Sequence, residues 1–259
     1  MSPARGRAAD LAGVVLAAGR GTRMRPITDR VPKPLLTVDN VPLLRSALDR
    51  MASLTADIAV NAHHLPAQVV DAARSWRPDV QVSLEREALA GTAGALHLLR
   101  GWIAGRPVVV TNADVILKGG VQALLAGWDG RRPRLLVVDT GAPADFGTLR
   151  YVGMSTLPAA AAAGLGPQPD GLYAAVWKPA FAAGELEFVE FEGAAFDCGT
   201  AAEFLAANMF ASNGRSVVAP DAVVAGTLER SVVLAGGQVA SGEHLIGAVR
   251  DGAGHTLFG

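Results

Sequence analysis

Short apolar segments alternate with amphipathic segments along much of this chain, and this alternation limits the folds open to it. Residues 14–16 and 107–111 are rich in valine and are typical of buried strands, whereas residues 43–54 and 92–102 show apolar side chains at helical spacing. Strands that alternate with helices are typical of a parallel α/β sheet covered by helices. The sequence therefore predicts such a sheet.

The pattern becomes less regular after residue 141. Residues 148–154, 171–176 and 186–191 are still predicted as strands, and residues 200–212 as a helix. The segment 158–169 is rich in alanine, glycine and proline, which predicts an exposed loop.

The last part of the chain has a different repeat. Val217 and Val223 are six residues apart, as are Val233, Val239 and Leu245, and small residues or glycine follow each of them. A period of six with small corner residues predicts turns of a β-helix. We therefore expect a main domain over residues 1–212 and a coiled tail over residues 213–259. The exposed strand edges at the end of a β-helix are usually covered by another surface, so we also expect self-association through the tail.

Composition excludes several classes of function. The net charge of −1 over 259 residues offers no basic surface for nucleic acid. The apolar segment 11–19 is far shorter than the roughly 18 residues that span a bilayer, so we expect a buried first strand rather than a secretory signal or a membrane anchor. The single cysteine excludes an intramolecular disulfide and favours a reducing, cytoplasmic location.

A glycine-containing loop follows the first predicted strand. Gly19 and Gly21 let backbone N–H groups turn toward a phosphate, and Arg23 and Lys33 add positive charge. The loop lacks the Gly-Lys-Ser/Thr of a Walker A motif, and Met24 replaces the third glycine of a dinucleotide-binding fingerprint. The pattern favours a nucleoside triphosphate in a different type of loop.

Residues 16–36 resemble the signature of the sugar-1-phosphate nucleotidyltransferases, Leu-Ala-Ala-Gly-x-Gly-Thr-Arg-x-x-Pro-x-Thr followed by Pro-Lys-Pro-Leu. The resemblance continues at residues 60–69, 91–96, 111–114 and 197–200, and so covers about residues 12–210. It implies a Rossmann-like three-layer α/β/α core, and the tail resembles the short left-handed β-helix of several members.

The resemblance also implies an activity. An oxygen of a sugar 1-phosphate attacks the α-phosphate of a nucleoside triphosphate, pyrophosphate leaves, and an NDP-sugar forms. The attacking phosphate is already ionised at pH 7, so positioning and charge neutralisation by the protein and Mg²⁺ replace a general base.

Site roles follow from matching positions in the signature. Arg23 would hold the β- and γ-phosphates, Lys33 would stabilise charge at the α-phosphate, and Asp114 and Asp197 would bind Mg²⁺. Asp114 is counted with Arg23 and Lys33 as catalytic. The expected nucleotide-binding residues are Leu16, Ala17, Ala18, Gly19, Gly21, Thr22, Glu87, Gly91, Thr92 and Asn112. His63, His64 and Cys198 are interpreted as packing or supporting residues.

Three interpretations of the function remain open. We favour a mannose-1-phosphate guanylyltransferase-like enzyme over a uridylyl- or thymidylyltransferase acting on N-acetylmuramate 1-phosphate or another sugar 1-phosphate. A non-catalytic regulatory subunit that binds a nucleotide sugar is a hypothesis of another class. Many members use a lysine to contact the sugar phosphate, but residues 151–172 contain none.

Overall fold

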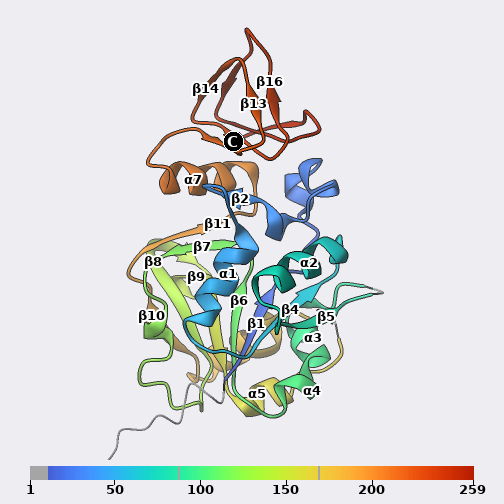
Figure 1. The fold of residues 1–259 in the computed structure, drawn as a ribbon. Coiled ribbons are helices and arrows are strands. Elements are labelled where there is room, and N and C mark those ends of the chain that lie inside the picture. The colour runs from blue at the N-terminus through green and yellow to red at the C-terminus, as the bar shows by residue number, and fades with distance from the viewer. Residues whose placement is uncertain (1–10, 87, 169) are drawn as a thin grey trace, which may run out of the picture.

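A mixed seven-stranded sheet forms the centre of the computed structural model, which describes residues 11–86, 88–168 and 170–259 (Figure 1). The strand order is β10-β8-β9-β6-β1-β4-β5. The strands are β1 (Ala12–Leu16), β4 (Ile58–Ala62), β5 (Gln81–Leu84), β6 (Val108–Asn112), β8 (Arg134–Ala144), β9 (Gly147–Leu157) and β10 (Glu187–Glu190).

The register at the centre of the sheet prepares the site. Strand β1 pairs in parallel with β4 on one side and with β6 on the other. Leu16, the last residue of β1, lies opposite Asn61 and Asn112. The carboxyl ends of three neighbouring strands therefore meet at one edge, which is where α/β sheets bind ligands.

Strand β9 corrects the expectation of a purely parallel sheet. It pairs antiparallel with both β6 and β8. Strand β8 ends at Ala144 and β9 begins at Gly147, so the connection is too short for the crossover that a parallel pair needs. A tight hairpin reverses the chain at this position.

Helices cover both faces of the sheet. On one face, α1 (Leu43–Ala52) and α2 (Pro66–Trp76) pack against Val15, Val60 and Val109. On the other, α3 (Gly91–Leu98), α4 (Arg100–Ile103) and α5 (Ala159–Ala163) pack against strand residues that include Val14 and Val110. The side chains of successive residues of one strand, such as Val14 and Val15, thus pack into the cores on opposite faces of the sheet, as is expected of a strand buried on both faces. The expected three-layer α/β/α core is confirmed.

Two predicted segments have a different structure. Residues 171–176 were predicted as a strand, but residues 172–176 are helical: the π-helical turn η6 (Tyr173–Trp177) continues into α6 (Lys178–Ala182). Leu172 and Val176 are buried four residues apart while Tyr173 is exposed, which is helical spacing. The segment 158–169, predicted as a loop, contains α5, which consists of five consecutive alanines, and alanine is the best helix former. Pro169 of this segment lies outside the described residues.

A short ribbon beside the sheet joins two distant parts of the chain. Strand β7 (Val115–Lys118) pairs antiparallel with β11 (Ala194–Asp197), and Asp197 lies opposite Val115. Helix α7 (Ala201–Ala211) follows, started by a capping box in which Thr200 and Glu203 exchange hydrogen bonds. The ribbon places Asp197 next to the chain that carries Asp114.

The tail forms the coils that its repeat predicts. Its strands pair in parallel on three faces: β12 with β15 and β15 with β18 on the first, β13 with β16 on the second, and β14 with β17 on the third. The bounds are β12 (Val217–Val218), β13 (Val223–Val224), β14 (Thr227–Glu229), β15 (Val232–Val233), β16 (Gln238–Val239), β17 (His244–Ile246), β18 (Ala248–Arg250) and a closing antiparallel β19 (Thr256–Phe258).

The tail and the main domain share a hydrophobic core. Val217, Val232 and Val249 pack in one cluster with Phe204 of α7 and with Met24 of the glycine loop. The same loop region contains the turns η2 (Thr22–Met24), η3 (Ile27–Asp29) and η4 (Lys33–Leu35), and the hairpin β2 (Thr37–Val38) and β3 (Val41–Pro42). The coils in Figure 1 therefore stand directly above α7 and this loop region. The boundary between residues 212 and 213 stays a prediction.

Membrane spans are absent from the described part of the chain. Among the helices of residues 11–86, 88–168 and 170–259, none has the length and apolar character needed to cross a bilayer.

Candidate functional site

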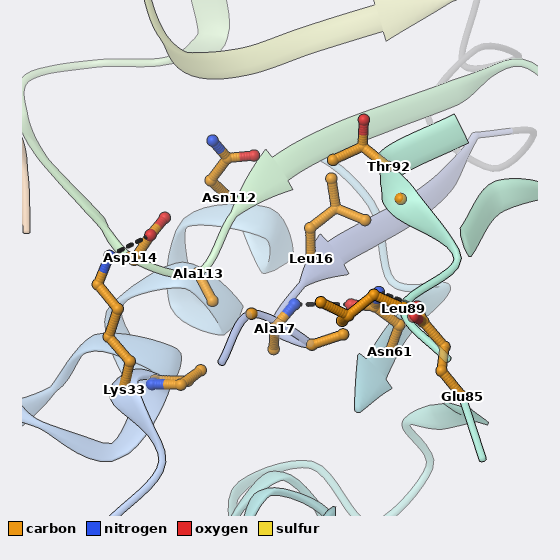
Figure 2. Close-up of a pocket in the computed structure, with 14 residues that line it drawn as sticks. Leu16, Ala17, Lys33, Asn61, Glu85, Leu89, Thr92, Asn112, Ala113 and Asp114 are labelled. Atoms are coloured by element: carbon orange, nitrogen blue, oxygen red, sulfur yellow. Dashed lines mark hydrogen bonds and ion pairs between the residues drawn. The ribbon is translucent and has the colours of Figure 1, made fainter. Parts of the chain in front are cut away.

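A cavity of about 300 Å³ opens at the carboxyl ends of β1, β4 and β6 (Figure 2). Nine of the predicted site residues line it, together with five that were not predicted. The predicted ones are Leu16, Ala17, Ala18, Gly19, Lys33, Gly91, Thr92, Asn112 and Asp114, and the others are Pro34, Asn61, Glu85, Leu89 and Ala113. Gly21, Thr22, Arg23 and Asp197 are outside this lining, and Glu87 lies outside the described residues.

Asn61 and Glu85 form a polar relay that the sequence reasoning missed. The backbone N–H of Ala17 donates to Asn61 Oδ1 at 2.6 Å, and Asn61 Nδ2 donates to Glu85 Oε1 at 2.7 Å. Glu85 Oε2 accepts the N–H of Ala90 at 2.7 Å. Both side chains are buried, so the relay fixes the start of the glycine loop against the segment that precedes α3.

A signal for this relay was present in the sequence. Asn61 belongs to β4, which pairs with β1, and Glu85 directly follows β5. Polar residues at the carboxyl ends of adjacent parallel strands meet at one edge of the sheet. Strand order, which only the fold supplies, was needed to apply that rule.

Gly21 is required by the local backbone. Its φ is +63°, and an added Cβ would lie 2.9 Å from Thr28 Cγ2 and 3.1 Å from Lys33 Cβ. The buried Thr28 hydroxyl donates to the carbonyl of Gly21 at 2.8 Å. The loop is thereby tied to the turn that precedes Lys33.

Lys33 and Asp114 form the charged end of the cavity. Lys33 Nζ lies 2.5 Å from Asp114 Oδ2, drawn as a dashed line in Figure 2. The Lys33 side chain is 7% exposed and the Asp114 side chain 34%. The lysine is therefore held almost out of water, while the carboxylate remains open to a ligand.

Asp197 and Arg23 lie next to this pair. Burial raises the pKa of Asp197, the negative charge of Asp114 raises it further, and the positive charges of Lys33 and Arg23 oppose the shift. A Cβ on Gly199 would lie 2.6 Å from Arg23 Nη2 and 3.1 Å from Asp197 Oδ1. Glycine at position 199 thus allows the guanidinium to approach this carboxylate. The fold thus brings together Arg23, Lys33, Asp114 and Asp197, the charged residues predicted for catalysis and metal binding.

The two carboxylates fit a divalent cation. Burial is the main cause of the raised pKa of Asp197 and the negative charge of Asp114 adds to it, and a bound cation would offset both contributions. Among the described residues, no cluster of three or more histidine, cysteine, aspartate or glutamate side chains is arranged to hold a metal. Asp114 and Asp197 would therefore share the ion with phosphate oxygens and water, the usual arrangement for Mg²⁺.

His63, His64 and Cys198 behave as supporting residues. His63 Nδ1 lies 2.7 Å from the carbonyl of Glu85, and His64 Nε2 lies 2.6 Å from the carbonyl of Thr28. Cys198 is fully buried, and burial raises the pKa of its thiol to about 12. A thiol that stays protonated at neutral pH is a poor nucleophile.

Comparisons with known proteins agree with this geometry. Residues 12–151 match the model of the nucleotidyl transferase family. The chain is 35% identical over 129 residues to N-acetylmuramate alpha-1-phosphate uridylyltransferase of Caulobacter vibrioides (46% of this chain, 53% of that protein). It is 33% identical over 120 residues to mannose-1-phosphate guanyltransferase of Pichia angusta (44% and 33%). The aligned part thus spans about half or less of these relatives.

A solved structure extends the likeness of the fold to the tail. The Thermus thermophilus protein named mannose-1-phosphate geranyltransferase superimposes with a TM-score of 0.69 at 18% identity. The match covers 96% of this chain and 94% of that one. At this identity the likeness shows the fold alone, and it includes the β-helical coils as well as the sheet.

Proposed function

This chain belongs to the nucleotidyl transferase family, and from that premise we propose that it transfers a nucleotidyl group from a nucleoside triphosphate to a sugar 1-phosphate. The observation that supports the proposal most directly is the cavity at the ends of β1, β4 and β6. One of its sides is the glycine loop, and its charged end holds Lys33 and Asp114, with Asp197 and Arg23 beside them.

The reaction needs charge neutralisation more than proton transfer. A phosphate oxygen of the sugar 1-phosphate forms a bond to the α-phosphorus, the bond from that phosphorus to the bridging oxygen of the β-phosphate breaks, and the electron pair leaves with pyrophosphate. We assign Lys33 to the charge that develops on the α-phosphate and Arg23 to the leaving phosphates. Gly19, Gly21 and Thr22 would receive the triphosphate through the loop.

We assign Asp114 and Asp197 to a Mg²⁺ ion. When bound, such an ion neutralises phosphate charge and aligns the reacting groups. Lys33 holds the Asp114 carboxylate in place, so Asp114 is already oriented toward the cavity before a ligand arrives.

For the base we favour guanine. Glu85 supplies a carboxylate to the cavity lining; its two oxygens each accept one hydrogen bond, from Asn61 and from Ala90, and each has a second lone pair that can only accept. Guanine has two neighbouring donors on its pairing edge, whereas uracil and thymine have one donor between two carbonyl oxygens. Leu16, Ala17, Gly91, Thr92 and Asn112 complete the proposed nucleotide site. The sugar is proposed to be mannose, with N-acetylmuramate 1-phosphate and UTP as the alternative pair.

A matrix assay tests the proposal. Pyrophosphate release is measured with each of four nucleoside triphosphates against a panel of sugar 1-phosphates in the presence of Mg²⁺. We expect turnover with GTP and mannose 1-phosphate. Turnover only with UTP selects the uridylyl alternative. Binding of nucleotide sugars without turnover in any combination contradicts the enzyme proposal and supports a regulatory subunit.

We further propose a cytoplasmic location, supported by the single cysteine, and self-association through the tail. Val223, Ile246 and Phe258 of the coils are 62%, 52% and 72% exposed. They belong to three different sheets of the tail, and a second copy of the chain would cover the exposed apolar side chain of the face on which it docks. Light scattering coupled to gel filtration checks it, and a monomer at all concentrations contradicts it.

A further inference from the structure

Arg50 makes a set of contacts that the proposed reaction does not use. It lies near the end of α1, and its guanidinium points at the chain between β6 and β7. Nη2 donates to Thr111 Oγ1 at 3.0 Å and to the carbonyl of Asn112 at 3.3 Å, and Nη1 donates to the carbonyl of Val115 at 3.4 Å. All three acceptors therefore belong to the turn, residues 111–115, that contains Asp114.

The charge of Arg50 has no compensating anion. Among the described residues, no carboxylate lies within ion-pair distance of its guanidinium, and its buried Nε has no hydrogen-bond partner. Burial lowers the pKa of Arg50 to about 10, so the side chain is still charged at neutral pH. Arg50 is half-buried, and an unpaired charge that is partly removed from water is costly, so an apolar side chain would fill this position of α1 at lower cost. The contacts with the turn distinguish Arg50 from such a core residue.

The turn is held from its other side by β9. The Thr111 hydroxyl lies 3.3 Å from the carbonyl of Gly153, and a Cβ on Gly153 would come within 2.7 Å of Val115 Cγ1. Gly153 has a φ of +86°, so a side chain there is excluded by the backbone as well. Residues 111–115 therefore lie between the Arg50 guanidinium on α1 and the backbone of β9 at Gly153, where no side chain keeps the two segments apart.

We propose that Arg50 is a positioning residue, which fixes the 111–115 turn and through it the direction of the Asp114 carboxylate. Arg50 is absent from the lining of the cavity at the ends of β1, β4 and β6 and instead lines a separate cavity of about 350 Å³ together with Asp49 and Lys118. It therefore acts on Asp114 through the backbone rather than on the ligand. The planar guanidinium reaches three acceptors at once, which neither a lysine ammonium nor a neutral side chain reproduces. That Arg50 fixes the turn is inferred from these contacts, which we call the structural part of the proposal. That it thereby affects catalysis through Asp114 rests on the proposed function.

Hydrogen exchange of the ligand-free full-length chain tests the structural part without any activity. We expect Arg50→Met to accelerate exchange of the amides of residues 112–116 at least tenfold, while amides of β1 and β4 keep their protection. Arg45→Met is the matched control, because Arg45 is on the same helix but pairs with Asp49 at the surface. Unchanged exchange at 112–116 in a folded Arg50→Met protein overturns the proposal.

Kinetics test the catalytic consequence. Arg50→Met should lower kcat on the order of tenfold and raise the Mg²⁺ concentration for half-maximal rate, with the KM for the nucleoside triphosphate within about twofold. Arg50→Lys should be intermediate, and Arg45→Met should match the wild type. A merely structural role would lower the amount of folded protein but leave these constants unchanged in what remains.

The outcomes separate the two proposals. If Arg50→Met does not fold, Arg50→Lys decides, and exchange and kcat equal to the wild type in that variant contradict the positioning role. If the wild type turns over no substrate pair, the proposed function fails, whereas the exchange experiment still decides whether Arg50 fixes the turn.

Discussion

Lys33 and Asp114 lie 81 residues apart in the chain and form an ion pair of 2.5 Å at the end of the cavity. In the ligand-free protein, each therefore neutralises the other. A divalent cation at Asp114 would compete with this contact and leave the Lys33 ammonium to face phosphate. The pair thus links the proposed metal site to the proposed phosphate site.

Lys33→Met should reduce kcat by about 100- to 1000-fold, because a preorganised positive charge is removed from the transition state. The fold should survive, since Asp114 is 34% exposed and can be solvated. Pyrophosphate release and a thermal unfolding curve measure the two effects. Lys178→Met, which removes an exposed lysine, is the control. A Lys33→Met protein with near wild-type kcat would remove Lys33 from the mechanism.

Asp114→Asn should abolish most activity and raise the Mg²⁺ requirement, and it should also lower the pKa of Asp197. The sign follows from charge: the carboxylate of Asp114 raises the pKa of Asp197, so a neutral amide withdraws that contribution. NMR titration of the Asp197 carboxyl in a chelator, with and without the substitution, measures the shift. Asp129→Asn is the control. Full activity in Asp114→Asn would refute the metal assignment.

Asn61→Ala should raise the KM for the nucleoside triphosphate and destabilise the protein by about 1–3 kcal/mol. It leaves the Ala17 N–H and one oxygen of the buried Glu85 carboxylate without a partner. Glu85→Gln should reduce discrimination for GTP more than it reduces kcat. Gln81→Ala, on the exposed side of β5, is the control for both. Unaltered nucleotide selectivity in Glu85→Gln argues against guanine recognition by this carboxylate.

Leu234→Ala in the tail should lower the free energy of unfolding of the whole chain by about 2–5 kcal/mol. Leu234 is 7% exposed and belongs to the cluster that also contains Met24 and Phe204. Val223→Ala, at a side chain that is 62% exposed, should change little. Chemical denaturation followed by fluorescence measures both. Separate transitions for the tail and the main domain would show that the shared cluster does not couple them.

The sequence alone determined the features that depend on local pattern. Valine-rich segments predicted the strands β1 and β6, because burial on both faces of a sheet leaves continuous apolar runs. Apolar side chains at helical spacing predicted α1 and α3, and the less regular pattern after residue 141 still predicted α7. The glycine loop was recognisable from Gly19, Gly21 and the signature around them, and the structure gives Gly21 the positive φ that glycine tolerates. The six-residue spacing predicted the coils. The family resemblance supplied Arg23, Lys33, Asp114 and Asp197, and the fold brings their charges together.

Only the tertiary structure decided the features that depend on strand order and long-range contact. The direction of β9 follows from the short hairpin that joins it to β8 rather than from its apolar content. The helical turn at residues 173–177 depends on the surroundings that bury Val176 and Trp177 and leave Tyr173 exposed. The roles suggested for Asn61, Glu85 and Arg50 arise from contacts across 44, 24 and about 60 residues. Local propensity carries no information about such pairs, because the energy of a polar contact depends on which groups the fold places opposite each other.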